Sequence, residues 1–187
     1  KMVLEEIYRF PNGMTEENGQ RCWNVKALFR AILEGMKKCK KAGKSPVSMG
    51  IDTWAVDFVL LDKENKMLGD AVGYRDSRTA GMDEKVYEII PEEKLYERTG
   101  IQKQIFNTIY QLMAVKSNNP EILEHAETML MIPEYFNYLL TGEKASEYTN
   151  ATTTQLVSPE TKDWDYELIE MLGYPKQIFQ KIKKPGT

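Results

Sequence analysis

The chain has 187 residues, of which 42% are hydrophobic and 28% charged, with 25 basic and 28 acidic side chains. This composition is typical of one globular domain, and the interspersed charges form no basic stretch of the kind that binds nucleic acid. No apolar run reaches the roughly 20 residues that cross a membrane, and the first residues lack the pattern of a secretory leader. We therefore expect a cytoplasmic protein without nucleic-acid or membrane partners. Cys22, Cys39 and His125 are too few for a disulfide framework, a metal cluster or a Ser-His-Asp triad.

The first part of the chain alternates between strand and helix patterns. Asn24 is a suitable cap for a helix whose apolar residues recur every three or four positions from Val25 to Met36, and Gly43 follows its basic last turn. Short runs rich in apolar and β-branched residues predict strands around this helix, and the polar residues 62–66 predict a hairpin turn. The predicted strands are residues 3–10, 46–51, 54–61 and 67–74, with a further turn at residues 11–13.

After Arg75 the pattern becomes helical, with prolines near the first turn and glycines after the last turn of several segments. This order of elements predicts an α/β fold with a mixed sheet and flanking helices. The chain starts abruptly in a strand-like segment and ends in a polar loop, so we expect a domain that is incomplete at both ends. The predicted helices are residues 84–88, 91–98, 106–116, 120–128, 133–140, 165–172 and 175–181.

The first candidate site is Gly50-Ile-Asp-Thr-Trp-Ala-Val-Asp57, at the carboxyl end of a predicted strand. Open α/β sheets bind their ligands at this end of the strands. Asp52 can accept hydrogen bonds from ligand hydroxyls, and the ring of Trp54 can lie flat against the apolar face of a sugar. Equally, Asp52 and Thr53 can cap a turn while Trp54 fills the core. The residues alone leave these two interpretations balanced.

The second candidate site is Tyr74-Arg-Asp-Ser-Arg-Thr79, which holds more polar groups than a turn requires. Arg75 and Arg78 each offer a rigid fork of donors that suits a hydroxylated or anionic ligand. The density of polar groups close to the first cluster favours a binding site. In the alternative interpretation the two arginines form a structural ion network, and their partners there would be Asp70, Asp76 and Asp83.

A third polar segment, residues 142–155, contains four threonines and an asparagine. Ser, Thr and Asn side chains readily satisfy backbone groups in loops, so a buried, hydrogen-bonded loop or short strand is the favoured interpretation. The chain also lacks a Gly-x-x-x-x-Gly-Lys-Ser/Thr loop, a Gly-x-Gly-x-x-Gly loop and a His-Glu-x-x-His motif. Nucleotide chemistry is therefore not expected from these residues.

Together these segments resemble the FGGY carbohydrate kinases over essentially the whole chain. Within that family, Asp-Thr-Trp combined with Tyr-Arg-Asp-Ser-Arg-Thr is similar to the branch that phosphorylates L-rhamnulose. Two departures stand out: Ala55 occupies a position where this branch usually has glycine, and Gln111 stands where the wider family expects lysine. The residues that carry the resemblance are 50–62, 74–79 and 147–156, with Ile7-Tyr-Arg-Phe-Pro-Asn-Gly13, 106–112 and Asp163-Trp-Asp165 in the same order.

The resemblance implies a ribonuclease H-like (actin-like ATPase) fold and a two-domain enzyme that uses ATP and Mg²⁺ to phosphorylate the 1-hydroxyl of L-rhamnulose. Residues 1–187 would be part of the N-terminal, sugar-binding domain, without the C-terminal nucleotide domain. The catalytic base is then expected beyond Thr187, no cofactor or metal site is expected in this chain, and the isolated chain is expected to be inactive. The substrate-binding residues that the clusters and the resemblance indicate are Asp52, Thr53, Trp54, Ala55, Tyr74, Arg75, Asp76, Phe106 and Asn107.

Other functions remain open from the sequence. The substrate can be another ketose or polyol, such as fuculose, xylulose or glycerol. A non-catalytic sugar-binding module would use the same polar residues without phosphoryl transfer. A purely structural actin-like domain ranks last, because it has no need for the polarity of residues 52–54 and 74–79.

Overall fold

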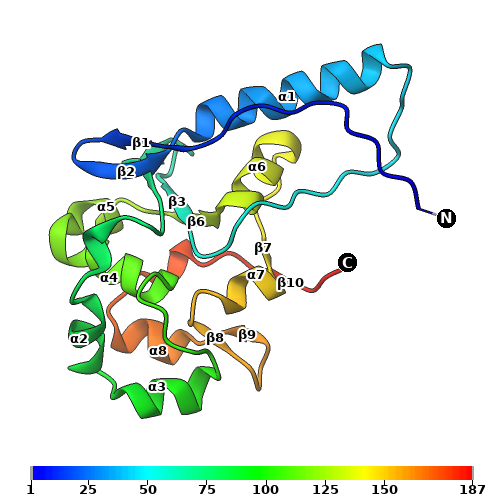
Figure 1. Cartoon of the computed structure of the whole chain (residues 1–187). Helices are drawn as coiled ribbons and strands as arrows, with labels where there is room; N and C mark the ends of the chain where they lie inside the picture. The colour runs from blue at the N-terminus through cyan, green and yellow to red at the C-terminus, as the bar shows by residue number, and fades with distance from the viewer. Residues whose placement is uncertain (1, 187) are drawn as a thin grey trace.

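The computed structural model describes residues 2–186 as short strands with helices packed around them (Figure 1). Strand β3 lies in the middle of the sheet β4-β3-β6, and β2 lies in the middle of the sheet β1-β2-β5. Two smaller pairs, β7 with β10 and β8 with β9, complete the pairing. The strands are β1 (Met14–Glu17), β2 (Gln20–Trp23), β3 (Phe58–Leu61), β4 (Met67–Leu68), β5 (Ala71–Val72), β6 (Thr128–Met131), β7 (Ser146–Glu147), β8 (Val157–Ser158), β9 (Asp163–Trp164) and β10 (Ile182–Lys183).

Most of the helices lie in the second part of the chain, as its pattern predicts. The long helix α1 runs along one side of the molecule, and the helices from α2 onward gather on the other side of the strands, except α6 (Figure 1). The α-helices are α1 (Val25–Lys41), α2 (Met82–Tyr87), α3 (Glu92–Thr99), α4 (Thr108–Asn118), α5 (Pro120–Glu124), α6 (Ile132–Thr141), α7 (Tyr148–Thr152) and α8 (Tyr166–Met171). Two 3-10 turns, η1 (Ser77–Thr79) and η2 (Lys176–Ile178), complete the set.

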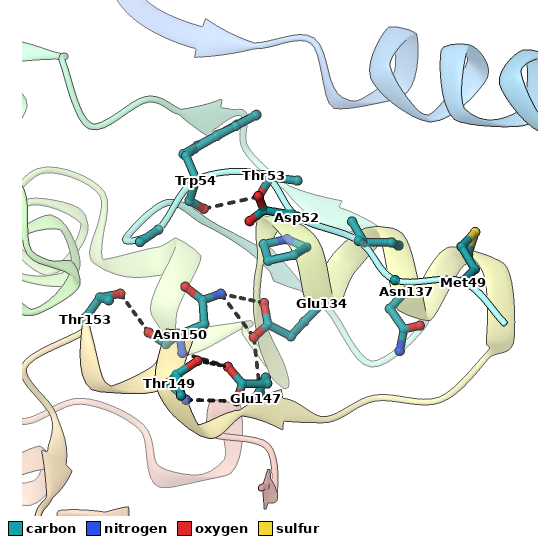
Figure 2. A pocket seen from close by; sticks show the side chains of 14 residues that line it. Met49, Asp52, Thr53, Trp54, Glu134, Asn137, Glu147, Thr149, Asn150 and Thr153 are labelled. Carbon is teal, nitrogen blue, oxygen red and sulfur yellow. Dashed lines mark hydrogen bonds between the residues drawn. The ribbon is translucent and has the colours of Figure 1, made fainter. Parts of the chain in front are cut away.

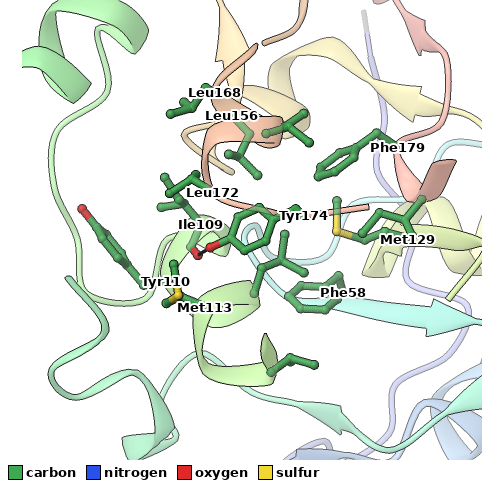
Figure 3. Packing of buried hydrophobic residues seen from close by; sticks show 14 of the residues in the cluster. Phe58, Ile109, Tyr110, Met113, Met129, Leu156, Leu168, Leu172, Tyr174 and Phe179 are labelled. Atoms are coloured by element: carbon green, nitrogen blue, oxygen red, sulfur yellow. Dashed lines mark hydrogen bonds between the residues drawn. The ribbon is translucent and has the colours of Figure 1, made fainter. Parts of the chain in front are cut away.

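The antiparallel pair β3–β6 separates two hydrophobic cores. Successive side chains of a strand point to opposite faces, so Val59 and Leu61 face one core while Phe58 and Leu60 face the other. The smaller core joins the first face to α1 and α6, where Phe136 is buried. The larger core joins the second face to α4 and α8 (Figure 3). This arrangement brings residues far apart in the sequence to the ends of β3.

Helix α1 confirms the predicted capped, amphipathic helix. The Asn24 side chain accepts a hydrogen bond from the Ala27 backbone N–H at 2.9 Å, which satisfies one of the free donors of the first turn. Val25 and Leu28 are buried, whereas Met36, predicted on the same apolar face, is 46% exposed. Near its C-terminal end the helix extends past the strands (Figure 1).

Two predicted strands are not formed. Residues 3–10 and 46–51 have no regular structure, and within residues 2–186 no strand pairs with either segment. An alternating pattern becomes a strand only when a neighbour supplies hydrogen-bond partners. Without one, apolar side chains of both segments remain in solvent; Leu4 is 88% exposed and Val47 is fully exposed.

Other boundaries also differ from the sequence-based expectation. The predicted strand 54–61 begins only at Phe58, because the preceding residues form a turn. Of the predicted returning strand 67–74, β4 pairs with β3 but β5 pairs with β2. The helix expected over residues 120–128 ends at Glu124 and gives way to β6, and only a 3-10 turn forms within residues 175–181. Pairing is both antiparallel and parallel, since β7 and β10 run in the same direction.

Candidate functional site

A cavity of about 580 Å³ lies at the amino-terminal side of β3 (Figure 2). One wall is the extended segment of residues 49–55, and the opposite wall comes from α6, β7 and α7. The cavity therefore joins the first predicted cluster to the third one. Its lining residues are Met49, Gly50, Ile51, Asp52, Thr53, Trp54, Ala55, Pro133, Glu134, Asn137, Glu147, Thr149, Asn150 and Thr153.

The predicted site residues Asp52, Thr53, Trp54 and Ala55 all line this cavity. Asp52 is exposed, and the Thr53 hydroxyl donates to the backbone carbonyl of Trp54 at 3.2 Å. The Trp54 ring lies 4.1 Å from the ring of Trp23, centroid to centroid, and packs against the smaller core. The core interpretation of Trp54 therefore holds, and the same ring also lines the cavity. Contact of this ring with a sugar stays a prediction.

Asp57 connects this wall to its surroundings. The side chain is fully buried, and its Oδ2 accepts hydrogen bonds from the indole N–H groups of Trp23 at 2.7 Å and Trp54 at 2.9 Å. The same oxygen accepts the Tyr74 backbone N–H at 3.1 Å, and Oδ1 accepts from Nε2 of Gln111 at 3.1 Å. Burial raises the pKa of the Asp57 carboxyl above its usual value, and these donors act against that rise. One carboxylate thus holds four separate segments together.

The turn before Asp57 has a strained backbone. Val56 has a φ of 66°, a conformation that β-branched residues rarely adopt, and the Asp57 N–H donates to the Ala55 carbonyl at 2.9 Å. The Val56 carbonyl accepts from the Thr108 hydroxyl at 2.7 Å and from Gln111 Nε2 at 3.1 Å. Helix α4 therefore holds the turn that places Ala55 at the cavity.

The remaining predicted site residues form a second group outside the lining of this cavity. The rings of Tyr74 and Phe106 meet edge to face with centroids 5.5 Å apart, and Arg75 Nε donates to the Tyr74 hydroxyl at 3.1 Å. Asp76 caps η1 and also accepts the Arg21 backbone N–H at 2.8 Å. Asn107 is buried, and its amide donates within the protein. Asp57, which accepts the Tyr74 N–H, and Gln111, which donates to Asp57 and to the Phe106 carbonyl, connect this second group to the cavity wall.

The ion network of Arg75 and Arg78 that the alternative interpretation offered is not formed among the described residues. Arg78 donates instead to the Gln111 side-chain oxygen at 2.7 Å, and its buried Nε lacks a partner in the part of the chain that the structure covers. Burial lowers the pKa of the Arg78 guanidinium. Asp83 pairs with Lys103 at 2.6 Å. Arg78 therefore supports Gln111, and through it the turn at Val56.

The third polar segment forms the short strand β7, as predicted, but residues 148–152 form the helix α7 where a loop or strand was expected. The Glu147 carboxylate caps α7 by accepting the Thr149 and Asn150 backbone N–H groups at 3.0 and 2.9 Å. The Asn150 amide donates to both carboxylate oxygens of the buried Glu134, at 3.1 and 3.0 Å. Burial raises the pKa of Glu134. These side chains also line the cavity, so the segment contributes to the site as well.

The sequence placed Asp57 at the end of the first candidate site without a role, and it did not identify Gln111 or Glu134 as site residues. Asp57 did carry a signal, because a carboxylate between the apolar Val56 and Phe58 of a buried run needs hydrogen-bond partners. Gln111 stood out only as a departure from the family pattern, and Glu134 carried no signal, since a polar residue on a predicted helix is ordinary. Their roles follow from the packing of α4 and α6 against the turn.

The described residues offer no metal site. Within residues 2–186, no three His, Cys, Asp or Glu side chains are grouped so that they could hold a metal ion. No helix in that part of the chain is long and apolar enough to cross a bilayer.

The profile described as "FGGY family of carbohydrate kinases, N-terminal domain" matches residues 3–187. The chain belongs to the FGGY family of carbohydrate kinases, as its motifs indicate. Among curated proteins, it is 60% identical over 185 residues to a rhamnulokinase of Halalkalibacterium halodurans and 53% identical over 187 residues to one of Oceanobacillus iheyensis. These matches cover 99% and 100% of the chain but 40% of each relative, so the chain spans about two fifths of their length.

Solved structures show the same fold. A xylulose kinase from Rhodospirillum rubrum superposes with a TM-score of 0.83 at 16% identity, covering 93% of this chain and 37% of that one. A ligand-bound xylulose kinase from Lactobacillus acidophilus gives 0.80 at 21% identity, covering 95% of this chain and 36% of that one. The fold is the ribonuclease H-like, actin-like fold that the sequence resemblance implied.

Proposed function

We propose that the chain is the sugar-binding, N-terminal part of a kinase that transfers the γ-phosphoryl group of ATP to the 1-hydroxyl of L-rhamnulose. In this reaction the hydroxyl oxygen forms a bond to the γ-phosphorus, the bond from that phosphorus to the bridging oxygen of ADP breaks, and a base takes the hydroxyl proton. The observation that carries the proposal is the identity of 60% and 53% to proteins named rhamnulokinase along the whole chain.

The geometry of the cavity supports a sugar ligand. Its first wall offers the exposed carboxylate of Asp52, the Thr53 hydroxyl and the half-buried ring of Trp54. Carboxylates accept hydrogen bonds from sugar hydroxyls, and an indole covers an apolar sugar face. Tyr74 and Phe106 extend this aromatic surface next to the cavity in our proposal. ATP, Mg²⁺ and the catalytic base are assigned to parts of the enzyme other than residues 2–186.

The test is the substrate range of the full-length protein. We expect ADP release with L-rhamnulose at a kcat/KM at least about tenfold above that with L-fuculose, D-xylulose or glycerol, a difference of about 1.4 kcal/mol. A preference for another of these substrates would overturn the assignment of L-rhamnulose but keep the assignment as a kinase. Sugar binding without ADP release from any of them would instead favour the non-catalytic module.

The isolated chain of residues 1–187 should release no ADP above background with ATP, Mg²⁺ and L-rhamnulose. The reason is that residues 2–186 group no metal ligands and carry no assigned base. A coupled ADP assay of the chain beside the full-length protein measures this. Turnover by the chain that survives repurification would contradict the assignment of the base to another part of the enzyme.

A further inference from the structure

The cavity has a second polar wall, opposite residues 52–55, that none of the predicted site residues occupies. It is formed by side chains of α6, β7 and α7, and Figure 2 shows them facing the cavity across from Asp52 and Thr53. The residues of this second wall are Glu134, Asn137, Glu147, Thr149, Asn150 and Thr153.

The second wall has more acceptors to offer than donors. The Asn150 amide nitrogen is used by Glu134, and Figure 2 shows the side-chain oxygen of Asn150 turned away from that carboxylate. Among residues 2–186, no hydrogen bond reaches this oxygen. The hydroxyls of Thr149 and Thr153 donate within the wall, to Glu147 and to the Asn150 backbone carbonyl at 2.7 Å, which leaves their lone pairs available.

The charge of the cavity has one sign. Three of its lining residues, Asp52, Glu134 and Glu147, are acidic, and none of the lining residues is a lysine, arginine or histidine. Such a cavity favours a ligand that donates hydrogen bonds and disfavours an anionic ligand by like-charge repulsion. An uncharged polyhydroxylated molecule fits both conditions.

We propose that the second wall is a hydroxyl-recognition subsite, in which Asn150, Asn137 and Thr153 determine which polyhydroxylated ligand the cavity binds. Glu134 acts as a positioning residue, because its carboxylate fixes the Asn150 amide and thereby turns the Asn150 oxygen toward the ligand. The inference rests on the proposed function for the sugar, and it goes beyond it by assigning specificity to α6 and α7 rather than to residues 52–55 alone.

The experiment is a double-mutant-type cycle on the full-length protein, in which each protein variant is combined with each deoxy analogue of the substrate. It compares the parent with Asn137→Ala and Asn150→Ala, using L-rhamnulose and its analogues that lack the hydroxyl at C3, C4 or C5. Asn137 is exposed and its side chain makes no hydrogen bond within the described residues, so Asn137→Ala should fold as the parent does. Asn118→Ala, an exposed asparagine outside this cavity, is the matched control.

We expect each variant to lower kcat/KM for L-rhamnulose by about tenfold, the size of one lost hydrogen bond to a buried ligand. For one deoxy analogue, the parent protein should show a kcat/KM about tenfold below its value for L-rhamnulose. The variant should have almost the same kcat/KM for this analogue as for L-rhamnulose. The control should leave all values within about twofold. If the effects of the substitution and of the missing hydroxyl do not add, the side chain contacts that hydroxyl directly. A structural effect would instead lower kcat/KM by the same factor for L-rhamnulose and for every analogue.

Two outcomes overturn the inference. Either both variants leave the kcat/KM pattern unchanged, or both lower kcat/KM equally for L-rhamnulose and all its analogues. Calorimetric binding of the same sugars without ATP repeats the cycle independently of turnover. If the parent protein binds sugar but phosphorylates none, the proposed function fails while this binding cycle still decides the role of the second wall.

Discussion

Replacing Asp57 by alanine should lower the free energy of unfolding by about 4 kcal/mol or more, because four buried or partly buried donors lose their acceptor at once and each costs about 1–3 kcal/mol. The donors are the indole N–H groups of Trp23 and Trp54, the Tyr74 backbone N–H and the Gln111 amide. Urea unfolding of the full-length protein, followed by tryptophan fluorescence, measures the change. Two of the donors are themselves fluorophores, so the emission of the folded state should change as well.

Two further variants make the Asp57 result interpretable. Asp57→Asn keeps one oxygen for the three donors that Oδ2 serves, so we expect a smaller loss of about 1 kcal/mol. Glu160→Ala removes an exposed carboxylate and should change stability by less than about 0.5 kcal/mol. If Asp57→Ala were as stable as Glu160→Ala, the hydrogen bonds of Asp57 would not hold the segments together.

The second large effect concerns the cavity wall itself. In the full-length protein, Trp54→Ala should raise the KM for the sugar by about tenfold or more and change the KM for ATP by less than about threefold, since the ring lines the cavity assigned to the sugar. Steady-state kinetics with each substrate varied in turn separate the two values. Trp54→Phe, which keeps a ring but not the N–H donor to Asp57, should lie between the parent and the alanine variant.

The control for Trp54 is Trp164→Phe. Trp164 is buried in the larger core, outside the lining of the cavity, and its N–H donates to the Gln180 carbonyl at 2.6 Å. Its replacement should lower stability but leave the ratio of the two KM values unchanged. Comparable increases of both KM values in Trp54→Ala would show instead that Trp54 acts as a core residue.

Both effects have one structural origin. Trp54 reaches the cavity because Asp57 binds its indole N–H, and Asp57 is held by the turn at Val56 and by Gln111 of α4. Asp57 and Gln111 lie between the two groups of predicted site residues, which are residues 52–55 and the group that contains Tyr74 and Phe106. The variants of Asp57 should therefore raise the sugar KM through Trp54 even though the cavity lining does not include Asp57.

The sequence by itself determined the features that depend on neighbours a few residues apart. The Asn24 cap and the apolar face of α1 follow from a period of three to four residues, and the turn at residues 62–66 follows from Asp62, which accepts the N–H groups of Glu64 and Lys66. The motif at residues 52–55 was recognisable for the same reason, because its residues are contiguous. The family resemblance added the fold class.

Only the tertiary structure decided which strands form and which side chains meet. Among residues 2–186, the strand patterns of residues 3–10 and 46–51 find no paired neighbour. Residue 128 was expected to end a helix, but it begins β6, which pairs with β3. Three of the four donors to Asp57 come from residues 17 to 54 positions away, and Glu134 of α6 meets Asn150 of α7 within the second wall. Hydrogen bonds and burial between distant segments depend on how the chain packs, and a local pattern of residues carries no record of that packing.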